Sequence, residues 1–314
     1  MADAMVYVPP FLAGRRGKAG IGASMYYLFL WATKIVPRLP RRLLRWLPAI
    51  LGPLTWLVAV SVRRRATINA LHVLGPEIRQ TAAGRRKLRR VVRGMFRSSI
   101  NNYLEAFLMP RLSSQEVMRR LSTEHNEYLE EALALGKGVI LFSAHFGPFE
   151  YMARWFTANS YRVVIPVEKL KDERILRLMI ELRSSSGVNY VPLGGSAPLR
   201  TIIQALRNNQ IVLITADRAV EGESVVRDFF GAPACLPIGP VNLSMRTGAP
   251  LVGALGWYSS GGRIRGEFIR LTLALSEEER RQPEIIEGAL LKELERVIRA
   301  HPEQWVVFSK VWVE

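Results

Sequence analysis

The chain has 314 residues, a formal net charge of +17 and 49% hydrophobic residues. This composition excludes a disordered or fibrous protein and suffices for one large α/β domain or two smaller ones. The single cysteine, Cys235, excludes an internal disulfide and a cysteine-based zinc cluster, and the four histidines lack metal-ligand spacing. We therefore expect no structural metal and no cofactor.

The positive charge is concentrated in residues 1–120, which hold 22 of the 44 Lys and Arg but only four of the 27 Asp and Glu. The most apolar run of the chain, residues 46–62, lies there and is followed by three arginines, and a second apolar stretch covers 25–36. Such segments are typical of helices on an anionic membrane surface. The alternative is a helical subdomain with solvated arginines.

Seventeen residues that include two prolines and a glycine are at the lower limit for crossing a hydrocarbon core of ~30 Å, so we expect a shallowly embedded segment and not a full span. The aromatic residues of this region lie inside apolar runs and not among the arginines, so nucleic acid is not an expected partner. A secretory signal is not expected either, because no small-residue cleavage site follows a short apolar core.

Apolar periodicity predicts the elements in chain order. Two amphipathic helices are expected at 87–108 and 114–135. After Gly136, four apolar strands alternate with helices: strands at 138–144, 161–167, 189–193 and 210–216, and helices at 148–159, 171–186 and 197–208. Further strands are expected at 250–257, 263–275 and 304–311, with a helix at 283–300. The alternation predicts an α/β fold over 121–314, with a mostly parallel central sheet flanked by helices, preceded by a helical membrane-association region over 1–120.

Two polar residues directly follow apolar strands, where sheets of this kind carry their active groups: His145 and Asp217. Glu150 comes five positions after His145 across a Phe-Gly-Pro-Phe turn, so we expect its carboxylate to fold back onto the imidazole and support a general base. The amide of Gly147 and the following helix start are candidates for holding an oxyanion. The spacing alone leaves a structural histidine equally open.

The segment from His145 to Glu150 resembles the His-x4-Asp/Glu motif of the lysophospholipid acyltransferase superfamily. The branch it is most similar to contains bacterial lipid A late acyltransferases and mycobacterial phosphatidylinositol mannoside acyltransferases. Further stretches resemble that branch in the same order: 65–77, 183–187, 216–218, 229–231, 237–240, 246–249 and 301–305. One departure is Val220, which stands where the mannoside acyltransferases have a second acidic residue, and it leaves the acceptor open.

The resemblance implies transfer of a fatty acyl group from acyl-CoA or acyl-carrier protein to a sugar hydroxyl of a membrane glycolipid, without an acyl-enzyme. His145 would be the base and Glu150 its partner. Arg183 would bind the acceptor or the oxyanion, although a helix-surface arginine is the alternative. The resemblance also implies a protein on the cytoplasmic face of the inner membrane.

Two further pairs of residues have two interpretations each. Asp217 with Arg218 would shape the floor of the site or would form a buried ion pair that only secures the strand end. Phe229 and Phe230 would line the acyl channel or belong to the core. Both interpretations remain open for each group.

Other function classes predict different features. A glycerolipid acyltransferase would share the motif but use a lysophospholipid acceptor. A serine esterase needs a Gly-x-Ser-x-Gly elbow, and the stretch 194–197 lacks the last glycine. A non-catalytic membrane-binding protein would use the basic region alone.

Overall fold

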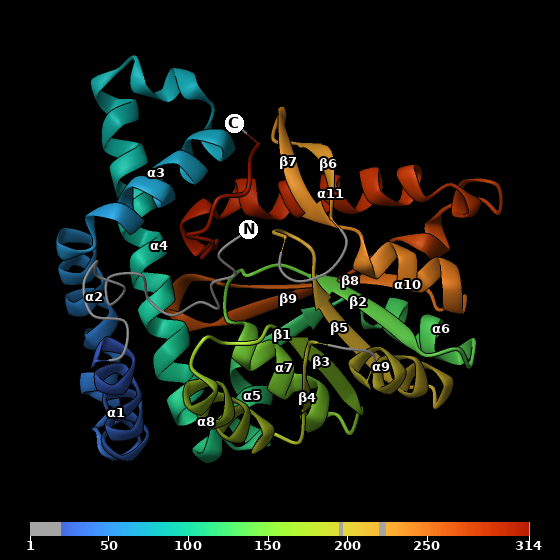
Figure 1. Cartoon of the computed structure of the whole chain (residues 1–314), viewed down its shortest axis with the longest axis horizontal. Helices are drawn as coiled ribbons and strands as arrows, with labels where there is room; N and C mark the ends of the chain where they lie inside the picture. Colours follow the sequence, from blue (N-terminus) through green and yellow to red (C-terminus); the bar gives the residue numbers. More distant parts are fainter. Residues whose placement is uncertain (1–19, 195–196, 220–223, 314) are drawn as a thin grey trace.

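The computed structural model describes residues 20–194, 197–219 and 224–313. The first 19 residues of the predicted membrane-association region lie outside these ranges, and so does Val220. A seven-stranded sheet forms the centre of the molecule, with helices on both sides (Figure 1). Its strands are β1 (Leu121–Glu124), β2 (Val139–Ser143), β3 (Val163–Val167), β4 (Asn189–Pro192), β5 (Ile211–Thr215), β8 (Leu251–Tyr258) and β9 (Ile264–Arg270).

The strand order is β1-β9-β8-β2-β5-β3-β4. Strands β8, β2, β5, β3 and β4 run parallel, whereas β9 is antiparallel to β8 and carries β1 parallel to itself. The α/β fold with a mostly parallel sheet is therefore confirmed. The carboxyl ends of β2, β5 and β3 are neighbours in this order, so the residues that follow these strands meet at one edge of the sheet.

Alternation along β2 divides the core into two layers, because successive strand side chains point to opposite faces. Ile140 and Phe142 pack on the side covered by α9 (Ala197–Arg207), α10 (Gly239–Thr247) and α11 (Pro283–Ala300). Val139 and Leu141 pack on the side covered by α5 (Ser114–Arg120), α6 (Asn126–Ala134) and α7 (Phe149–Ala158). All five residues of β2 are buried, which explains its continuously apolar sequence.

The N-terminal helices lie at one end of the sheet (Figure 1). They are α1 (Gly20–Ile35), α2 (Arg41–Val58), α3 (Val60–Leu74) and the long α4 (Ala82–Leu108). The buried face of α4 packs against α3 and the C-terminal segment, and its last turns pack against α1 and α8 (Glu173–Ser184). No single described helix is both long and apolar enough to cross a membrane; the pair α2–α3, bent by 102°, meets the length and composition criteria together.

The main differences from the prediction are two misassigned elements and one unpredicted hairpin. The helix expected over 114–135 is broken by β1, because His125 adopts a left-handed conformation with φ 62° and Leu121 pairs with Ile264 of β9. The strand expected over 304–311 is an irregular buried segment, in which Val306 N–H donates to the His145 carbonyl. A hairpin of β6 (Ser224–Phe229) and β7 (Ala232–Pro237) was not anticipated.

Candidate active site

The centre of the site is a hydrogen-bonded pair formed by His145 and Asp217. These residues follow the adjacent strands β2 and β5, so the sheet brings together positions 72 residues apart. His145 Nδ1 lies 2.8 Å from Asp217 Oδ1, and the His145 backbone N–H donates to Asp217 Oδ2 at 2.8 Å. The indole Nε1 of Trp305 also donates to Oδ2 at 2.8 Å. Three groups therefore hold one carboxylate, whose side chain is 0% exposed.

The environment of Asp217 fixes its charge and the imidazole tautomer. Burial by itself would raise the pKa of this carboxyl, but the charge of His145 and the hydrogen bonds from His145 and Trp305 outweigh it and lower the pKa. An ionised carboxylate accepts hydrogen bonds only, so Nδ1 must carry the ring proton. Nε2 is then the basic nitrogen, on a side chain that is 22% exposed and lines a cavity.

A glycine turn holds His145 in this place. Gly147 has φ +58°, and a Cβ there would stand 2.0 Å from the Gly256 carbonyl oxygen. The Gly147 N–H donates to the Gln304 carbonyl at 3.0 Å, so the C-terminal segment fastens the turn. The prediction that the Gly147 amide holds an oxyanion is therefore wrong, because this amide is already bonded within the fold.

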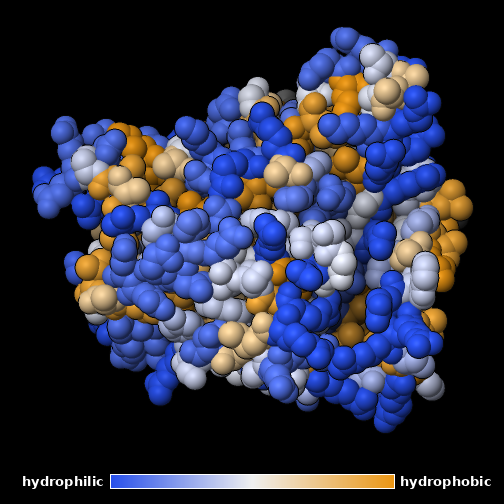
Figure 2. All heavy atoms as spheres, turned by 180° about the vertical axis from the view of Figure 1, so that it is seen from behind, coloured by the Kyte–Doolittle hydropathy of each residue, from blue (hydrophilic) through white to orange (hydrophobic). Residues whose placement is uncertain are grey.

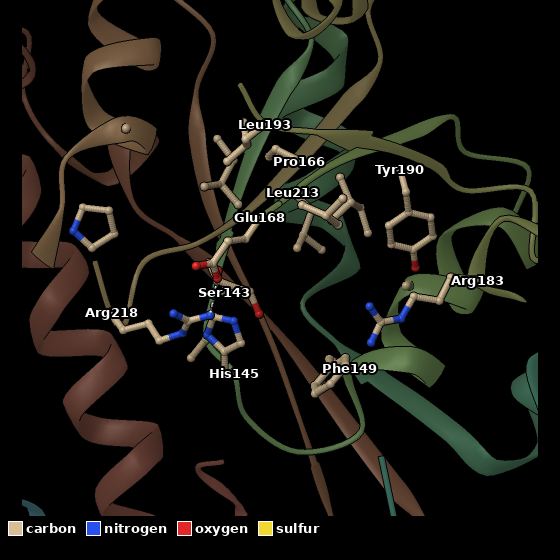
Figure 3. Close-up of a pocket in the computed structure, with 18 of the residues that line it drawn as sticks. Ser143, His145, Phe149, Pro166, Glu168, Arg183, Tyr190, Leu193, Leu213 and Arg218 are labelled. Carbon is tan, nitrogen blue, oxygen red and sulfur yellow. Dashed lines mark hydrogen bonds and ion pairs between the residues drawn. The ribbon is translucent and has the colours of Figure 1, made fainter. Parts of the chain in front are cut away.

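Glu150 is not the partner of His145, contrary to the prediction. Its carboxylate is 1% exposed, and its Oε1 lies 2.7 Å from both Nε and a terminal nitrogen of Arg183 on α8. The Tyr190 hydroxyl points toward the same guanidinium (Figure 3). Burial and then the charge of Glu150 raise the pKa of Tyr190, so this phenol stays protonated. Asp217 has the place beside the imidazole that the spacing suggested for Glu150.

Of the two interpretations of Asp217 with Arg218, the ion pair between them is wrong, while Arg218 lines the cavity of the site. Arg218 donates to Glu168 Oε2 at 2.9 Å, and both side chains are nearly buried. The second oxygen, Glu168 Oε1, has no hydrogen-bond partner among the described residues. Glu168 directly follows β3, so the rule that singled out His145 and Asp217 could have identified it.

A cavity of about 600 Å³ joins these groups (Figure 3). His145, Glu168 and Arg218 lie on one side of it, and Arg183 and Tyr190 on the other. The rest of the wall is mainly apolar and comes from several elements: Phe29, Ile165, Leu176, Met179, Leu193, Leu199, Ile202, Leu213 and Leu243. A mainly apolar space whose wall also holds a histidine and a few charged groups suits a molecule with a hydrocarbon chain and a polar group.

Phe229 and Phe230 do not line this cavity. Phe229 is fully buried and packs against Trp305 and Trp312 in the core layer under α11. Phe230 packs on the same cluster, with the Arg299 guanidinium 5.2 Å from its ring centroid. The predicted acyl-channel role is therefore wrong for both residues, and the core interpretation holds.

Comparison with known proteins agrees with the resemblance seen in the sequence. The profile of the family described as bacterial lipid A biosynthesis acyltransferase matches residues 19–314. Phosphatidylinositol mannoside acyltransferase of Mycobacterium tuberculosis is 29% identical to this chain over 213 residues. The aligned region covers 67% of this chain and 66% of that protein, just under two thirds of its length. The protein of the same name in Mycolicibacterium smegmatis is 26% identical over 225 residues, 71% of this chain and 72% of its own. The family profile covers nearly the whole chain, and the chain therefore belongs to the bacterial lipid A biosynthesis acyltransferase family.

Proposed function

We propose that this protein transfers a fatty acyl group from a thioester, acyl-CoA or acyl-carrier protein, to a hydroxyl of a membrane glycolipid. The observation that carries the proposal is the His145–Asp217 pair, whose imidazole lines the mainly apolar cavity. Family membership and the names of the mannoside acyltransferases favour acyl transfer and a sugar hydroxyl.

The pair supplies a general base. Nε2 of His145 takes the proton of the acceptor hydroxyl while its oxygen attacks the thioester carbonyl. The tetrahedral intermediate then expels the thiolate, which takes that proton back from the imidazolium, so the products are an ester and a free thiol. Asp217 holds the tautomer throughout and stabilises the imidazolium.

A base mechanism fits better than a covalent one. Ser143 is the hydroxyl residue nearest in sequence, and its Oγ donates to the Ala254 carbonyl at 2.7 Å. Among the described residues, no serine, threonine or cysteine is hydrogen-bonded to the His145 ring, as an activated nucleophile would be.

The two ion pairs of the cavity are suited to position a sugar. Arg183, anchored by Glu150, presents donors on one side, and Glu168 presents an acceptor on the other. Sugar hydroxyls need both kinds of partner in a buried site. Arg183 is also a candidate for stabilising the oxyanion, the role in which Gly147 is not available.

His145→Ala tests the proposal. With a fatty acyl-CoA and a mannosylated phosphatidylinositol, mass spectrometry should detect the acylated product for the wild type and a rate lower by roughly 10²–10⁴-fold for the variant. Circular dichroism controls for folding. Turnover near the wild-type rate in a folded variant would contradict the base role, whereas transfer to a lysophospholipid in place of the mannoside would identify a glycerolipid acyltransferase.

We further propose that the N-terminal helices bind the cytoplasmic face of the inner membrane without spanning it. Their outward apolar side chains are strongly exposed: Leu28, Trp31, Trp46, Ile50, Leu54, Leu57, Val58 and Val60. Figure 2 shows hydrophobic residues along the edge where Figure 1 places α2. Arginines on the same helices complement anionic lipids.

Replacing both Leu57 and Val60, each 60% exposed, with serine tests this surface. Burial of aliphatic side chains in lipid contributes on the order of 1 kcal/mol each at this exposure, so vesicle binding should weaken by roughly 30-fold. Val226 and Ile285 are exposed elsewhere, and their serine variants form the matched control. Equal losses in the two double variants would refute the assignment.

A further inference from the structure

A second cavity, of about 1910 Å³, lies between α2, α4, α5 and the turn after β8. Ten arginines line it: Arg41, Arg42, Arg45, Arg90, Arg93, Arg97, Arg111, Arg119, Arg120 and Arg263. Among the residues that the structure describes, the carboxylates in its wall are only Glu105, Glu116 and Glu303. We refer to it as the arginine cleft. The face in Figure 2 is hollowed on the side of the N-terminal helices and bordered there by hydrophilic residues.

Few of these charges are compensated within the fold. Arg41 pairs with Glu116 at 2.9 Å, and Arg120 donates to the Tyr151 hydroxyl. Within the described part of the chain, no carboxylate forms an ion pair with four others: Arg42, Arg45, Arg90 and Arg97. Burial raises the pKa of Glu105 to about 8, so at neutral pH this side chain adds little negative charge. A cleft wall with this excess of positive charge attracts anions.

The arginine cleft is separate from the active site. It shares no lining residue with the cavity of His145. Helix α4 forms the partition: Asn102 and Tyr103 face the active site, while Asn101 and Glu105 face the cleft. A ligand bound in the cleft therefore does not contact the reacting atoms.

An apolar surface adjoins the cleft. Leu43, Trp46, Ile50 and Leu54 are exposed on α2, the helix that also carries Arg42 and Arg45, and Trp46 itself lines the cleft. Guanidinium groups bind phosphate oxygens with two parallel hydrogen bonds, and the neighbouring apolar side chains can contact acyl chains. The combination favours a ligand that is anionic at one end and apolar at the other.

We propose that the arginine cleft binds the phosphate-bearing headgroup of an anionic phospholipid that is not the acyl acceptor, with the acyl chains along the exposed side of α2. The inference rests on the proposed membrane association and deepens it, because it replaces a diffuse attraction with a discrete site. It does not depend on catalysis, so it can be tested in the full chain with or without activity.

The test compares two double variants with the same loss of charge. Arg45→Ala with Arg97→Ala removes one unpaired arginine from each of α2 and α4 in the cleft. Arg86→Ala with Arg89→Ala removes two exposed arginines of α4 outside it. Binding is measured to phosphatidylcholine vesicles and to vesicles that also contain phosphatidylglycerol. Each lost headgroup contact is expected to cost about a factor of five, so the cleft variant should lose roughly 30-fold on anionic vesicles only.

Equal weakening in the two double variants would overturn the proposal in favour of diffuse attraction, and so would unchanged binding in the cleft variant. Native mass spectrometry of the detergent-purified protein should show a single retained phosphatidylglycerol that the cleft variant lacks. Coenzyme A and inorganic phosphate are added as competitors: displacement of the lipid by stoichiometric coenzyme A would assign the cleft to the donor nucleotide and overturn the proposal. If the Leu57/Val60 variant loses vesicle binding while the cleft variant binds normally, the proposed membrane association is supported and only the proposed headgroup site is refuted.

Discussion

Replacing Asp217 with asparagine inverts the tautomer of His145 without a change of side-chain volume. Two donors, the His145 backbone N–H and Trp305 Nε1, converge on Oδ2, each at 2.8 Å. The asparagine oxygen must occupy this position to accept both, so its NH₂ group faces Nδ1, where Oδ1 is now 2.8 Å away. Nδ1 then becomes the acceptor, and Nε2 carries the proton that it should remove from the substrate.

The expected loss in kcat is roughly 10³–10⁴-fold, or about 4–5.5 kcal/mol, because general-base catalysis is removed and the wrong tautomer must be corrected in every turnover. The KM for acyl-CoA should change little, since Asp217 is buried behind the imidazole and is 0% exposed. Steady-state assays with acyl-CoA and a mannosylated phosphoinositide measure both constants. The ¹⁵N chemical shifts of His145 report the tautomer independently of activity.

Glu150→Gln is the matched control, because it removes a buried carboxylate from the same site but leaves the imidazole contact intact. This substitution should weaken the hydrogen bonds that position Arg183 and leave the Nδ1–H tautomer of His145 unchanged. If Asp217→Asn retains turnover within about tenfold of the wild type, or if its spectrum still shows a protonated Nδ1, the role assigned to Asp217 is refuted.

Two further predictions concern stability. A Cβ on Gly147 would stand 2.0 Å from a carbonyl oxygen, whereas one on Gly136, also at positive φ, meets no atom within 4 Å. Urea unfolding should therefore show that Gly147→Ala lowers the free energy of unfolding by about 3 kcal/mol or more, and Gly136→Ala by about 1 kcal/mol. Equal losses in the two variants would contradict this prediction. Burial raises the pKa of Glu105 from 4.5 to about 8 in the folded protein. Between these two pH values the folded protein keeps a proton that the unfolded chain releases. The contribution of Glu105 to the free energy of unfolding therefore falls by a few kcal/mol as the pH rises from about 4.5 to about 8. Glu105→Gln should flatten this slope between about pH 5 and pH 8, and an unchanged slope would remove the inference.

Most of the sheet could be predicted because its central strands are apolar runs, wholly buried in β2 and partly buried in β5. β2 and β5 are short apolar runs bounded by turn residues, and the helices between strands have clear periodicity. The predictions failed where long-range contacts override local pattern. Leu121 joins β9, 143 positions away, and interrupts a segment whose periodicity is helical. Residues 304–311 have the composition of a strand, but they fill the space beside His145 without joining a ladder.

The same distinction explains the errors at the site. The residues that follow β2 and β5 could be singled out from the sequence, since position after a strand is a local property, and the structure brings these two together. Their partners depend on the strand order, which periodicity does not reveal. Because β5 lies between β2 and β3, Asp217 after β5 contacts His145 after β2, and Arg218 pairs with Glu168 after β3. A spacing of five residues suggested Glu150 only because the turn was assumed to fold back.

In the structure the Gly147 turn feeds directly into α7, and the first turn of that helix directs Glu150 toward α8, where it meets Arg183. The acidic residue of the His-x4-Glu motif therefore contacts an arginine here and not the imidazole. Its burial without Arg183 would leave an uncompensated charge, which costs several kcal/mol, so the two side chains must be treated as one unit. Variants of Glu150 consequently report on how Arg183 is positioned, whereas variants of His145 and Asp217 test the proposed base.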